Sequence, residues 1–298
     1  MIDGVRMNQS LFTSYTTVRL SAAFILIGLL ISAGVQANPN GRLLATGGAM
    51  TAEGTAGGGI VPWAMIAGYA DESEWGGTAW LTGVEPKDFS LNAFGAALAW
   101  NNRVELSVSK QSFDINAVAP GETLEQSIVG IKTRVYGNLI YSRAPQISMG
   151  LLYKQNDTFT IPGAVGALDD SGFDVYVAAS KLWLDGLFNR SVFLNGTVRA
   201  TRANQLGLLG FGGDLNDSHE VVGEVSAGLF INRSWVLGAE YRQKPDNLSF
   251  AREDDWQDVF IGWFPNKRVS VVLAWAGLGS IAGFEDQDSV YLSLQLSQ

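Results

Sequence analysis

The chain has 298 residues, with 29 acidic and 20 basic side chains and a formal net charge of −9. This acidity argues against a nucleic-acid partner, which requires a basic face. The sequence contains no cysteine, which excludes a disulfide framework and a thiolate metal site. Its 35 glycines, 9 tryptophans, 8 tyrosines and 15 phenylalanines are typical of a β-barrel, although another glycine-rich β-protein would look similar.

The N-terminal residues have the pattern of a secretory signal peptide. Arg6 and Arg19 precede an apolar stretch from Ala22 to Val35, and Val35-Gln36-Ala37 offers small residues for cleavage after Ala37. The alternative is a transmembrane anchor, but this stretch is shorter than the roughly 20 apolar residues of a spanning helix. The sequence therefore predicts a signal peptide at 1–37 and one exported domain at 38–298.

Short strand-like runs with apolar residues at every second position fill the remainder of the chain. In 103–112, for example, Val104, Leu106 and Val108 alternate with polar residues such as Glu105. Such alternation predicts strands, because successive side chains of a strand point to opposite faces. The two earliest candidates are 42–52 and 60–69. The twelve that follow lie near 75–83, 90–100, 103–113, 126–136, 146–154, 172–182, 191–202, 220–231, 234–244, 257–264, 268–277 and 289–297.

The connectors between these runs are alternately short and long. Tight turns are expected at Asn101-Asn102, Asn232-Arg233 and 265–267, and long Gly/Asp-rich loops near 114–125, 155–171, 203–219, 245–256 and 278–288. This alternation is typical of a barrel in the bacterial outer membrane, which has short periplasmic turns and longer external loops. The apolar strand faces would then meet lipid. A soluble exported sandwich, with the same faces forming its core, is the alternative fold.

Aromatic residues near the expected strand ends favour the membrane barrel, in which they would form interfacial girdles. Ordinary packing is the alternative for each one. The residues expected at these positions are Trp63, Tyr69, Trp100, Tyr136, Tyr153, Trp235, Trp256 and Trp263.

The number of strands depends on the N-terminal part of the exported domain. Single-chain bacterial barrels have an even number of strands, and 60–69 would make thirteen. Counting 42–52 as well predicts an all-β, antiparallel, up-and-down transmembrane β-barrel of 14 strands. The alternative has 12 strands, with the Gly-rich N-terminal segment as a plug or periplasmic arm.

Several motifs carry a resemblance to a known family. They are Gly57-Gly58-Gly59-Ile60-Val61-Pro62-Trp63, Gly210-Phe211-Gly212-Gly213-Asp214, Lys244-Pro245-Asp246-Asn247-Leu248, Glu253-Asp254-Asp255-Trp256 and Trp263-Phe264-Pro265-Asn266-Lys267. Together they resemble a proteobacterial outer-membrane family known as domain of unknown function 3034, over nearly all of 41–298. The resemblance implies an exported β-barrel and brings no activity, substrate or catalytic residue.

Charged residues on the polar strand faces are the candidate lumen of the barrel. Mixed charges facing inward suit a water-filled pore whose selectivity they tune. They also suit a barrel closed by internal salt bridges, because buried charges need partners. The candidate pore-lining residues are Glu105, Lys132, Arg134, Arg199, Glu224, Glu240, Arg242 and Lys244.

The function expected from the sequence is a passive channel for small solutes. The alternatives are a closed structural or interaction barrel that acts through its external loops, and, third, a lipid-acting enzyme built on His219. His219 is adjacent to Ser218, which would point to the opposite face of a strand, so we expect no enzyme. Outer-membrane lipid, lipopolysaccharide and the outer-membrane assembly machinery are the expected partners.

Two clusters of acidic loop residues are candidate ligands for a metal ion. Asp214, Asn216 and Asp217 form one cluster, and 253–258 contains four acidic residues. Oxygen ligands of this kind suit Ca²⁺, but their spacing does not match an EF-hand loop, and solvated loop acids are the simpler interpretation. We therefore expect neither a metal nor a cofactor.

Overall fold

The computed structural model describes residue 45 and residues 47–298. The expected signal peptide at 1–37 and the first part of the 42–52 run lie outside these residues. No helix in the described part of the chain is long and apolar enough to cross a membrane.

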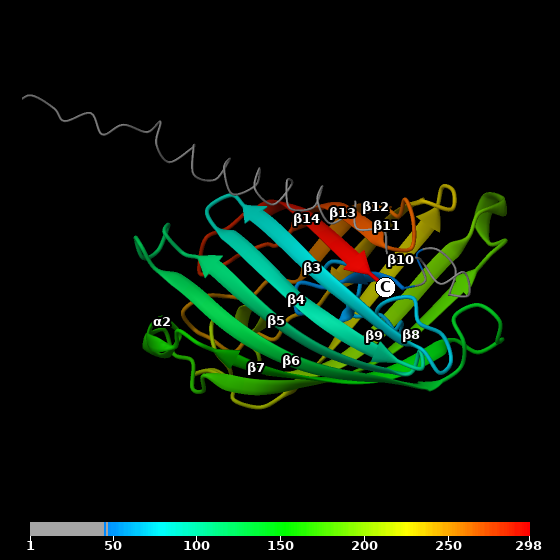
Figure 1. The fold of residues 1–298 in the computed structure, drawn as a ribbon. Helices are drawn as coiled ribbons and strands as arrows, with labels where there is room; N and C mark the ends of the chain where they lie inside the picture. Colours follow the sequence, from blue (N-terminus) through cyan, green and yellow to red (C-terminus); the bar gives the residue numbers. More distant parts are fainter. Residues whose placement is uncertain (1–44, 46) are drawn as a thin grey trace, which may run out of the picture. The chain divides into compact units, whose positions relative to one another are not determined.

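Twelve antiparallel strands of the described chain form a closed barrel (Figure 1). Each strand pairs with its neighbours in sequence, and β14 closes the barrel by pairing with β3 through a register that includes Leu294 and Leu81. The strands are β3 (Trp75–Pro86), β4 (Ser90–Trp100), β5 (Val104–Asp114), β6 (Thr123–Tyr136), β7 (Gln146–Asn156), β8 (Ser171–Trp183), β9 (Val192–Thr201), β10 (Glu220–Phe230), β11 (Trp235–Arg242), β12 (Trp256–Trp263), β13 (Val269–Gly277) and β14 (Asp288–Ser297). All twelve late runs are confirmed as strands, whereas the predicted total of 14 is wrong and the alternative of 12 is correct.

The described part of the 42–52 run and the whole of 60–69 lie inside the barrel. Residues 47–70, which we call the plug, are buried throughout and contain a two-residue pairing of β1 (Ala49–Met50) with β2 (Ala56–Gly57) and an isolated bridge between Gly57 and Pro62. In Figure 1 this segment is the blue and light-blue chain seen inside the strands. The apolar run 60–69 is therefore shielded from lipid by the barrel wall. The 14-strand prediction failed because burial inside a lumen and exposure to lipid select the same apolar composition.

The strand connections divide the barrel into two ends. At the short-turn end lie residues 101–103, 137–145, 184–191, 231–234 and 264–268, together with η1 (Leu187–Asn189). Asn101 and Asn102 have positive φ angles of 57° and 45°, as a tight primed hairpin turn requires. At the long-loop end lie 87–89, 115–122, 157–170, 202–219, 243–255 and 278–287, together with α2 (Thr160–Ala164) and η2 (Asn204–Gly207).

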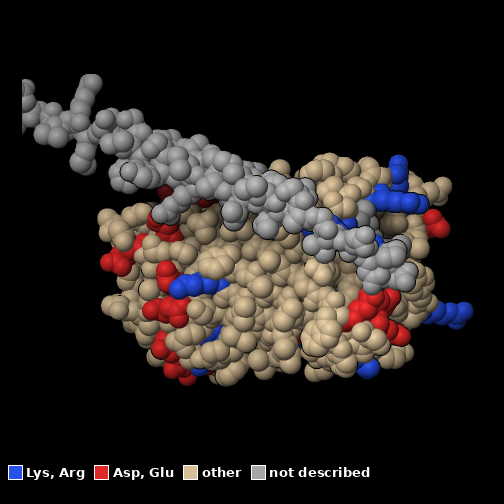
Figure 2. Space-filling view, in the orientation of Figure 1, with Lys and Arg blue, Asp and Glu red and all other residues tan. Residues whose placement is uncertain are grey.

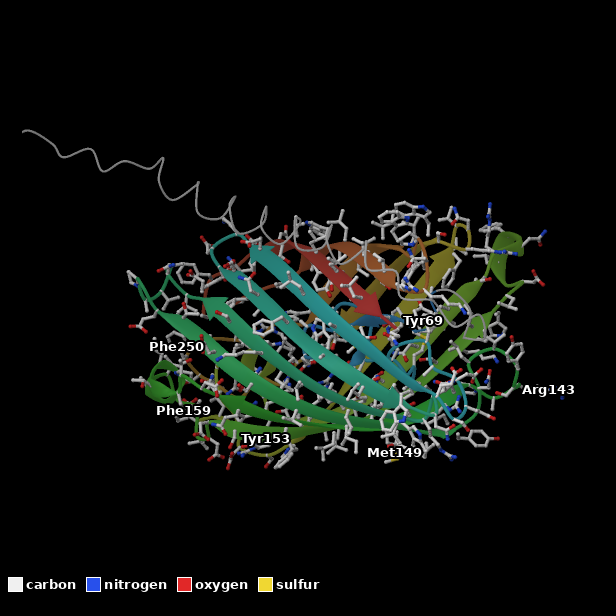
Figure 3. The ribbon with its side chains drawn as sticks, viewed as in Figure 1. Tyr69, Arg143, Met149, Tyr153, Phe159 and Phe250 are labelled. Carbon is white, nitrogen blue, oxygen red and sulfur yellow. The ribbon has the colours of Figure 1, made fainter. Side chains whose placement is uncertain are left out.

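The outer surface is apolar between these ends. Leu106 and Val108 on β5 are 52% and 56% exposed, whereas Glu105, at an inward position of the same strand, is buried. Figure 2 shows charged side chains towards the two ends and an uncharged surface between them. In Figure 3, Met149 and Tyr153 project outward from β7. The alternation therefore places apolar residues outside and polar residues inside, as in a membrane barrel.

The girdle prediction is only partly correct. Trp100, Tyr136, Trp235 and Trp263 are exposed at strand ends, and the rings of Trp235 and Trp263 stack with centroids 5.7 Å apart. By contrast, Trp63, Tyr69 and Trp256 are buried. Trp63 and Tyr69 belong to the plug, and the inward register of β12 directs Trp256 to the interior.

Candidate functional site

The interior of the barrel is a cage of strand side chains that bind the plug. Its centre is Glu53, the only charged residue of the plug. The Glu53 carboxylate forms ion pairs with Lys154 of β7, Arg199 of β9 and Arg242 of β11. The distance from Glu53 Oε2 to Arg199 Nη1 is 3.2 Å. One carboxylate of the plug therefore forms ion pairs with residues of three different strands.

Two further carboxylates complete this cluster. Asp174 of β8 lies 2.6 Å from Lys154 Nζ and 3.0 Å from Arg199 Nη1, and Glu224 of β10 lies 2.6 Å from Arg199 Nε. Burial by itself raises the pKa of Glu53, but the attraction of Arg199, Arg242 and Lys154 outweighs it and holds that pKa well below the usual range. Glu53 is therefore an anion whose charge the strand cations neutralise.

A second anchor consists of Glu105 of β5 and Lys132 of β6. Lys132 Nζ donates to the carbonyls of Ala56 and Met65 at 2.7 and 3.0 Å. Glu105 accepts hydrogen bonds from the backbone N–H groups of Ala56 and Ala67 at 3.1 and 2.8 Å. This pair lies 3.5 Å apart and binds backbone groups of the plug at Ala56, Met65 and Ala67.

Glu240 of β11 forms the third anchor. Its Oε2 accepts the N–H groups of Gly59 and Ile60 at 2.7 and 2.9 Å, and its Oε1 accepts the indole N–H of Trp63 at 3.1 Å. The hydroxyl of Ser226 donates to the same carboxylate at 2.7 Å. Asp258, its cross-strand neighbour on β12, is buried, and its Oδ1 has no hydrogen-bond partner among the residues that the structure describes. The two carboxyls thus differ: Glu240 is fully bonded to the plug, and Asp258 is not.

Uncharged polar side chains bind the rest of the plug backbone. Ala64 N–H donates to Ser180 Oγ at 2.8 Å, and the Ala64 carbonyl accepts from Ser148 Oγ at 2.6 Å. The Pro62 carbonyl accepts from Thr197 Oγ1 at 2.7 Å. Because these bonds go to backbone atoms, the plug needs few polar side chains of its own, which accounts for its Gly/Ala-rich composition.

The long-loop end is closed by loop 202–219. Leu206, Leu208 and Phe211 are buried there, and Lys154 Nζ donates to the Leu206 carbonyl at 3.0 Å. Asn156 Nδ2 donates to the Leu208 carbonyl at 2.7 Å. The loop is therefore held by the same strands that hold the plug.

Six of the eight predicted lumen residues are buried inside the barrel: Glu105, Lys132, Arg199, Glu224, Glu240 and Arg242. Arg134 lies near the end of β6 and is only half-buried. Lys244 lies beyond β11 in the loop, where its Nζ is 2.8 Å from Glu253 and 4.5 Å from the centre of the Trp256 ring. The structure brings the six together around the plug and leaves Arg134 and Lys244 outside this group.

Three members of the central cluster, Glu53, Lys154 and Asp174, were not among the residues predicted from the sequence. Lys154 and Asp174 occupy the inward positions of the same alternation that identified the other lumen residues. The signal for Glu53 is its isolation, because it is the only charge between Gly47 and Ala70.

The acidic loop residues bind other loops in the structure. Asp214 accepts hydrogen bonds from the backbone and hydroxyl of Ser249, and Asp254 accepts the N–H of Ser280 at 2.9 Å. Within residues 47–298 no group of three His, Asp or Glu side chains is arranged to hold a metal ion. The exposed His219 has its Nε2 3.1 Å from the carbonyl of Phe173.

The chain matches one protein family and is similar to several solved structures. The family described as "Protein of unknown function (DUF3034)" matches residues 46–295. Among solved structures, the KdgM porin aligns with 8% identity and a TM-score of 0.48, covering 74% of this chain and 98% of that one. The outer membrane protein Omp33 of Acinetobacter baumannii aligns with 9% identity and a TM-score of 0.46, covering 76% and 99%. The NanC porin aligns with 10% identity and a TM-score of 0.45, covering 74% and 98%.

All three TM-scores lie below 0.5. A comparison with curated protein sequences gave no match. What the chain does must therefore be inferred from the plug and the residues that bind it.

Proposed function

The chain belongs to the family described as protein of unknown function (DUF3034), and we propose that it is an outer-membrane barrel of the channel type, held closed at rest by its own plug. On displacement of the plug, the barrel passes small solutes passively. His219 has no catalytic role in this proposal. The partners are the surrounding lipid and lipopolysaccharide, and the assembly machinery that inserts the barrel.

The exterior supports the membrane location. Val108 of β5 and Val129 of β6 are neighbours across the two strands. Like Val259 of β12, their side chains are more than half exposed. A soluble protein rarely exposes a continuous apolar surface of this extent, whereas an outer-membrane barrel presents an apolar band about 25 Å tall to lipid. The longer loops would then lie outside the cell and the short turns in the periplasm.

The observation that carries the gating proposal is the position of Glu53. Removal of one partner from a buried ion pair leaves an uncompensated charge, at a cost of roughly 3–5 kcal/mol. Glu53 is the partner that the plug contributes, and three strand cations surround it. Inside the barrel the plug is thus attached by one carboxylate and by hydrogen bonds, and its chain continues through residues 71–74 into β3 of the wall.

The test is single-channel conductance of the refolded exported domain in planar lipid bilayers. We expect the wild type to be silent or to open rarely, and Glu53→Gln to open often, because the amide cannot neutralise Lys154, Arg199 and Arg242. Glu285→Gln, the same change on an exposed loop, is the matched control and should behave as the wild type.

A cysteine pair provides a second arm of this test. The chain contains no cysteine, so Ala64→Cys with Ser180→Cys introduces the only possible disulfide, between residues whose backbone N–H (Ala64) and side-chain hydroxyl (Ser180) form a hydrogen bond of 2.8 Å. When this pair is added to Glu53→Gln, oxidation should silence the channel and reduction should restore it. Openings that persist after complete oxidation would contradict plug gating.

The second candidate function is a closed structural barrel that acts through its loops. Complete pairing of the lumen cations favours it, since Lys132, Lys154, Arg199 and Arg242 all have carboxylate partners. This candidate predicts that Glu53→Gln remains silent in the bilayer although the folded protein inserts.

A further inference from the structure

The carboxylate of Glu53 is held in the way that a binding site holds a ligand. Arg242 contacts it with both ends of its guanidinium group, since Nη1 donates to Oε2 and Nη2 donates to Oε1 at 3.3 Å. Lys154 Nζ also donates to Oε1, and Arg199 Nη1 lies 3.3 Å from Oε1 and 3.2 Å from Oε2. A planar fork of donors matches the two oxygens of a carboxylate. The three cations therefore form a carboxylate-binding recess, which the plug fills with its own side chain.

Side chains of the barrel wall hold this recess in shape. Asp174 lies 2.6 Å from Lys154 Nζ and accepts a hydrogen bond from Arg199 Nη1 at 3.0 Å. Glu224 accepts hydrogen bonds from Arg199 Nε and Nη2 at 2.6 and 3.4 Å, and its Oε1 lies 3.8 Å from Arg242 Nε. The strands that carry Asp174 and Glu224, β8 and β10, flank the strand of Arg199. All of these side chains belong to the wall, so the recess is built independently of the plug.

The charges of the recess call for a ligand with one negative charge. Among the described residues, the three cations are opposed on the wall by two carboxylates, Asp174 and Glu224, which leaves a charge of +1. The single negative charge of Glu53 brings the cluster to zero. Because an uncompensated charge is costly inside a protein, the vacated recess favours a monoanion over a neutral molecule or a cation. Among monoanions, the planar fork of Arg242 favours a carboxylate.

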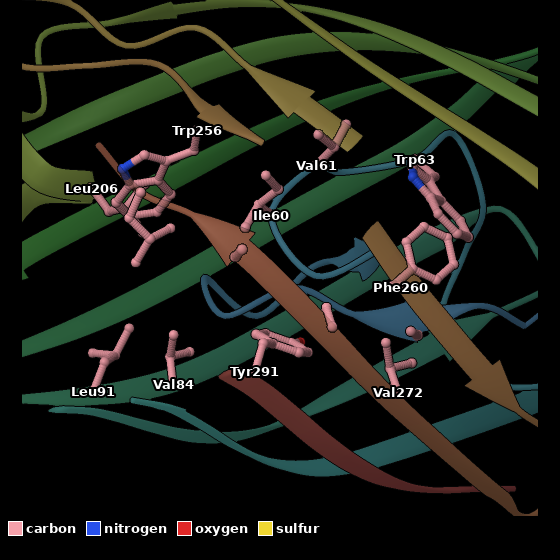
Figure 4. Packing of buried hydrophobic residues seen from close by; sticks show 14 of the residues in the cluster. Ile60, Val61, Trp63, Val84, Leu91, Leu206, Trp256, Phe260, Val272 and Tyr291 are labelled. Atoms are coloured by element: carbon pink, nitrogen blue, oxygen red, sulfur yellow. The ribbon is translucent and has the colours of Figure 1, made fainter. Parts of the chain in front are cut away.

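The plug keeps other contacts with the wall when Glu53 is shortened. Trp63 packs against Phe193 and Phe260, with ring centroids 4.3 and 6.4 Å apart, and Figure 4 shows Trp63 beside Phe260. Glu240 binds the plug through backbone N–H groups, which a substitution at residue 53 leaves in place. Glu53→Ala therefore empties the recess while these anchors remain.

We propose that Lys154, Arg199 and Arg242 form a binding site for the carboxylate group of a small monoanion, and that Glu53 occupies this site at rest. A carboxylate solute that reaches the site competes with Glu53 and favours the undocked plug. The binding site stands on the geometry of the wall, whereas the competition rests on the proposed channel function. The plug is thus an internal competitor of the solute that the barrel binds.

The first experiment refills the recess with acetate. Glu53→Ala removes from the side chain the same heavy atoms that acetate contains. The exported domain with this substitution is refolded in sodium acetate, in acetamide, or in sodium chloride at the same ionic strength. We expect acetate to raise the unfolding temperature at concentrations at least about tenfold lower than acetamide or chloride, because hydrogen bonds to a charged group are the stronger ones.

Two variants control for nonspecific stabilisation by acetate. Glu285→Ala makes the same change on an exposed loop and should not distinguish acetate from chloride. Glu53→Ala combined with Arg242→Gln removes the fork and the surplus positive charge, and should lose the effect of acetate. If Glu53→Ala folds poorly, the yield of folded barrel in acetate against acetamide is the measurement. Equal effects of the three additives on Glu53→Ala, or an acetate effect that survives Arg242→Gln, would overturn the binding site.

Single-channel recording tests the competition. Acetate should increase the openings of the wild type, in which it competes with Glu53. It should reduce the openings of Glu53→Ala, in which it restores the missing negative charge. Acetamide should change neither protein. An acetate effect of the same sign in both proteins would overturn the competition.

The outcomes also separate this inference from the channel function. Openings of Glu53→Gln, with no acetate effect on the stability of Glu53→Ala, would leave the channel standing and refute the binding site. Stabilisation by acetate together with currents that acetate does not change would leave the binding site standing and refute the competition. Stabilisation by acetate together with a silent Glu53→Gln would leave the binding site standing and refute the gated channel.

Discussion

Replacing Gly58 by alanine should undock the plug from Glu240. A Cβ atom at Gly58 would lie 2.0 Å from Glu240 Oε1 and 2.4 Å from its Cδ, far inside contact distance. At the neighbouring Gly59 a Cβ would meet Asp258 Oδ2 and the Tyr291 ring at 3.4 Å, which is ordinary contact. Neither glycine has a positive φ angle, so alanine is compatible with the backbone at both positions. Gly59→Ala, the same substitution at the next residue, is therefore a matched control.

The expected loss of docking free energy follows from the hydrogen bonds that must break. The Glu240 carboxylate is fixed by hydrogen bonds from Gly59, Ile60, Trp63 and Ser226, so neither it nor the plug can move aside without losing them. Each buried N–H left without a partner costs about 1–3 kcal/mol. Loss of the two backbone N–H bonds then weakens docking by about 2–6 kcal/mol, which is roughly one to four orders of magnitude in the ratio of docked to undocked plug.

Two assays measure the change in the ratio of docked to undocked plug. The open probability in a planar bilayer should rise in Gly58→Ala, and proteolysis of refolded protein in detergent should cleave residues 47–70 faster than in the wild type. Gly59→Ala should match the wild type in both assays. If Gly58→Ala is silent and its plug is as resistant to protease as in Gly59→Ala, the assignment of Glu240 as an anchor is refuted.

Three further predictions concern charge, lipid contact and catalysis. The pKa of Glu53 in the folded protein is held below its usual range, so the contribution of Glu53 to docking is present above the unfolded pKa and is lost as the pH falls through the lowered folded value. We therefore expect acid-induced openings of the wild type only at pH values below the usual pKa range of a glutamate. Over the same pH values, the openings of Glu53→Gln should not depend on pH. Arginine at Val259, which is 60% exposed in the middle of β12, should cost about 2–4 kcal/mol of unfolding free energy in lipid vesicles, against about 0–1 kcal/mol for Val221→Arg at a strand end. Equal costs at the two positions would contradict the assigned membrane depth. His219→Ala should leave the release of fatty acid from phospholipid vesicles unchanged, and a loss of such release would restore the enzyme hypothesis.

The inward and outward faces of the strands were predictable because they depend on a local rule. Glu105 and Leu106 are adjacent in the sequence and point to opposite sides of β5, one buried and one half exposed. The same rule located Lys132, Arg199 and Glu240 on the inner face. Ionic partners were not predictable in this way, since one of the carboxylates that join Lys154 to Arg199 belongs to Glu53, which lies 101 residues before Lys154 and 146 residues before Arg199 in the chain.

The sequence by itself located the twelve strands of the barrel, their two faces and most of the inner charges, because the alternation of a strand is local and has a period of two residues, but it added two strands that the closed barrel of the described chain does not contain. The tertiary structure alone decided where residues 47–70 lie and therefore whether the lumen is occupied. An apolar, Gly-rich segment has the same composition whether it faces lipid or fills a barrel. Only closure of the sheet between β14 and β3 creates an interior in which Glu53 can meet cations from three distant strands.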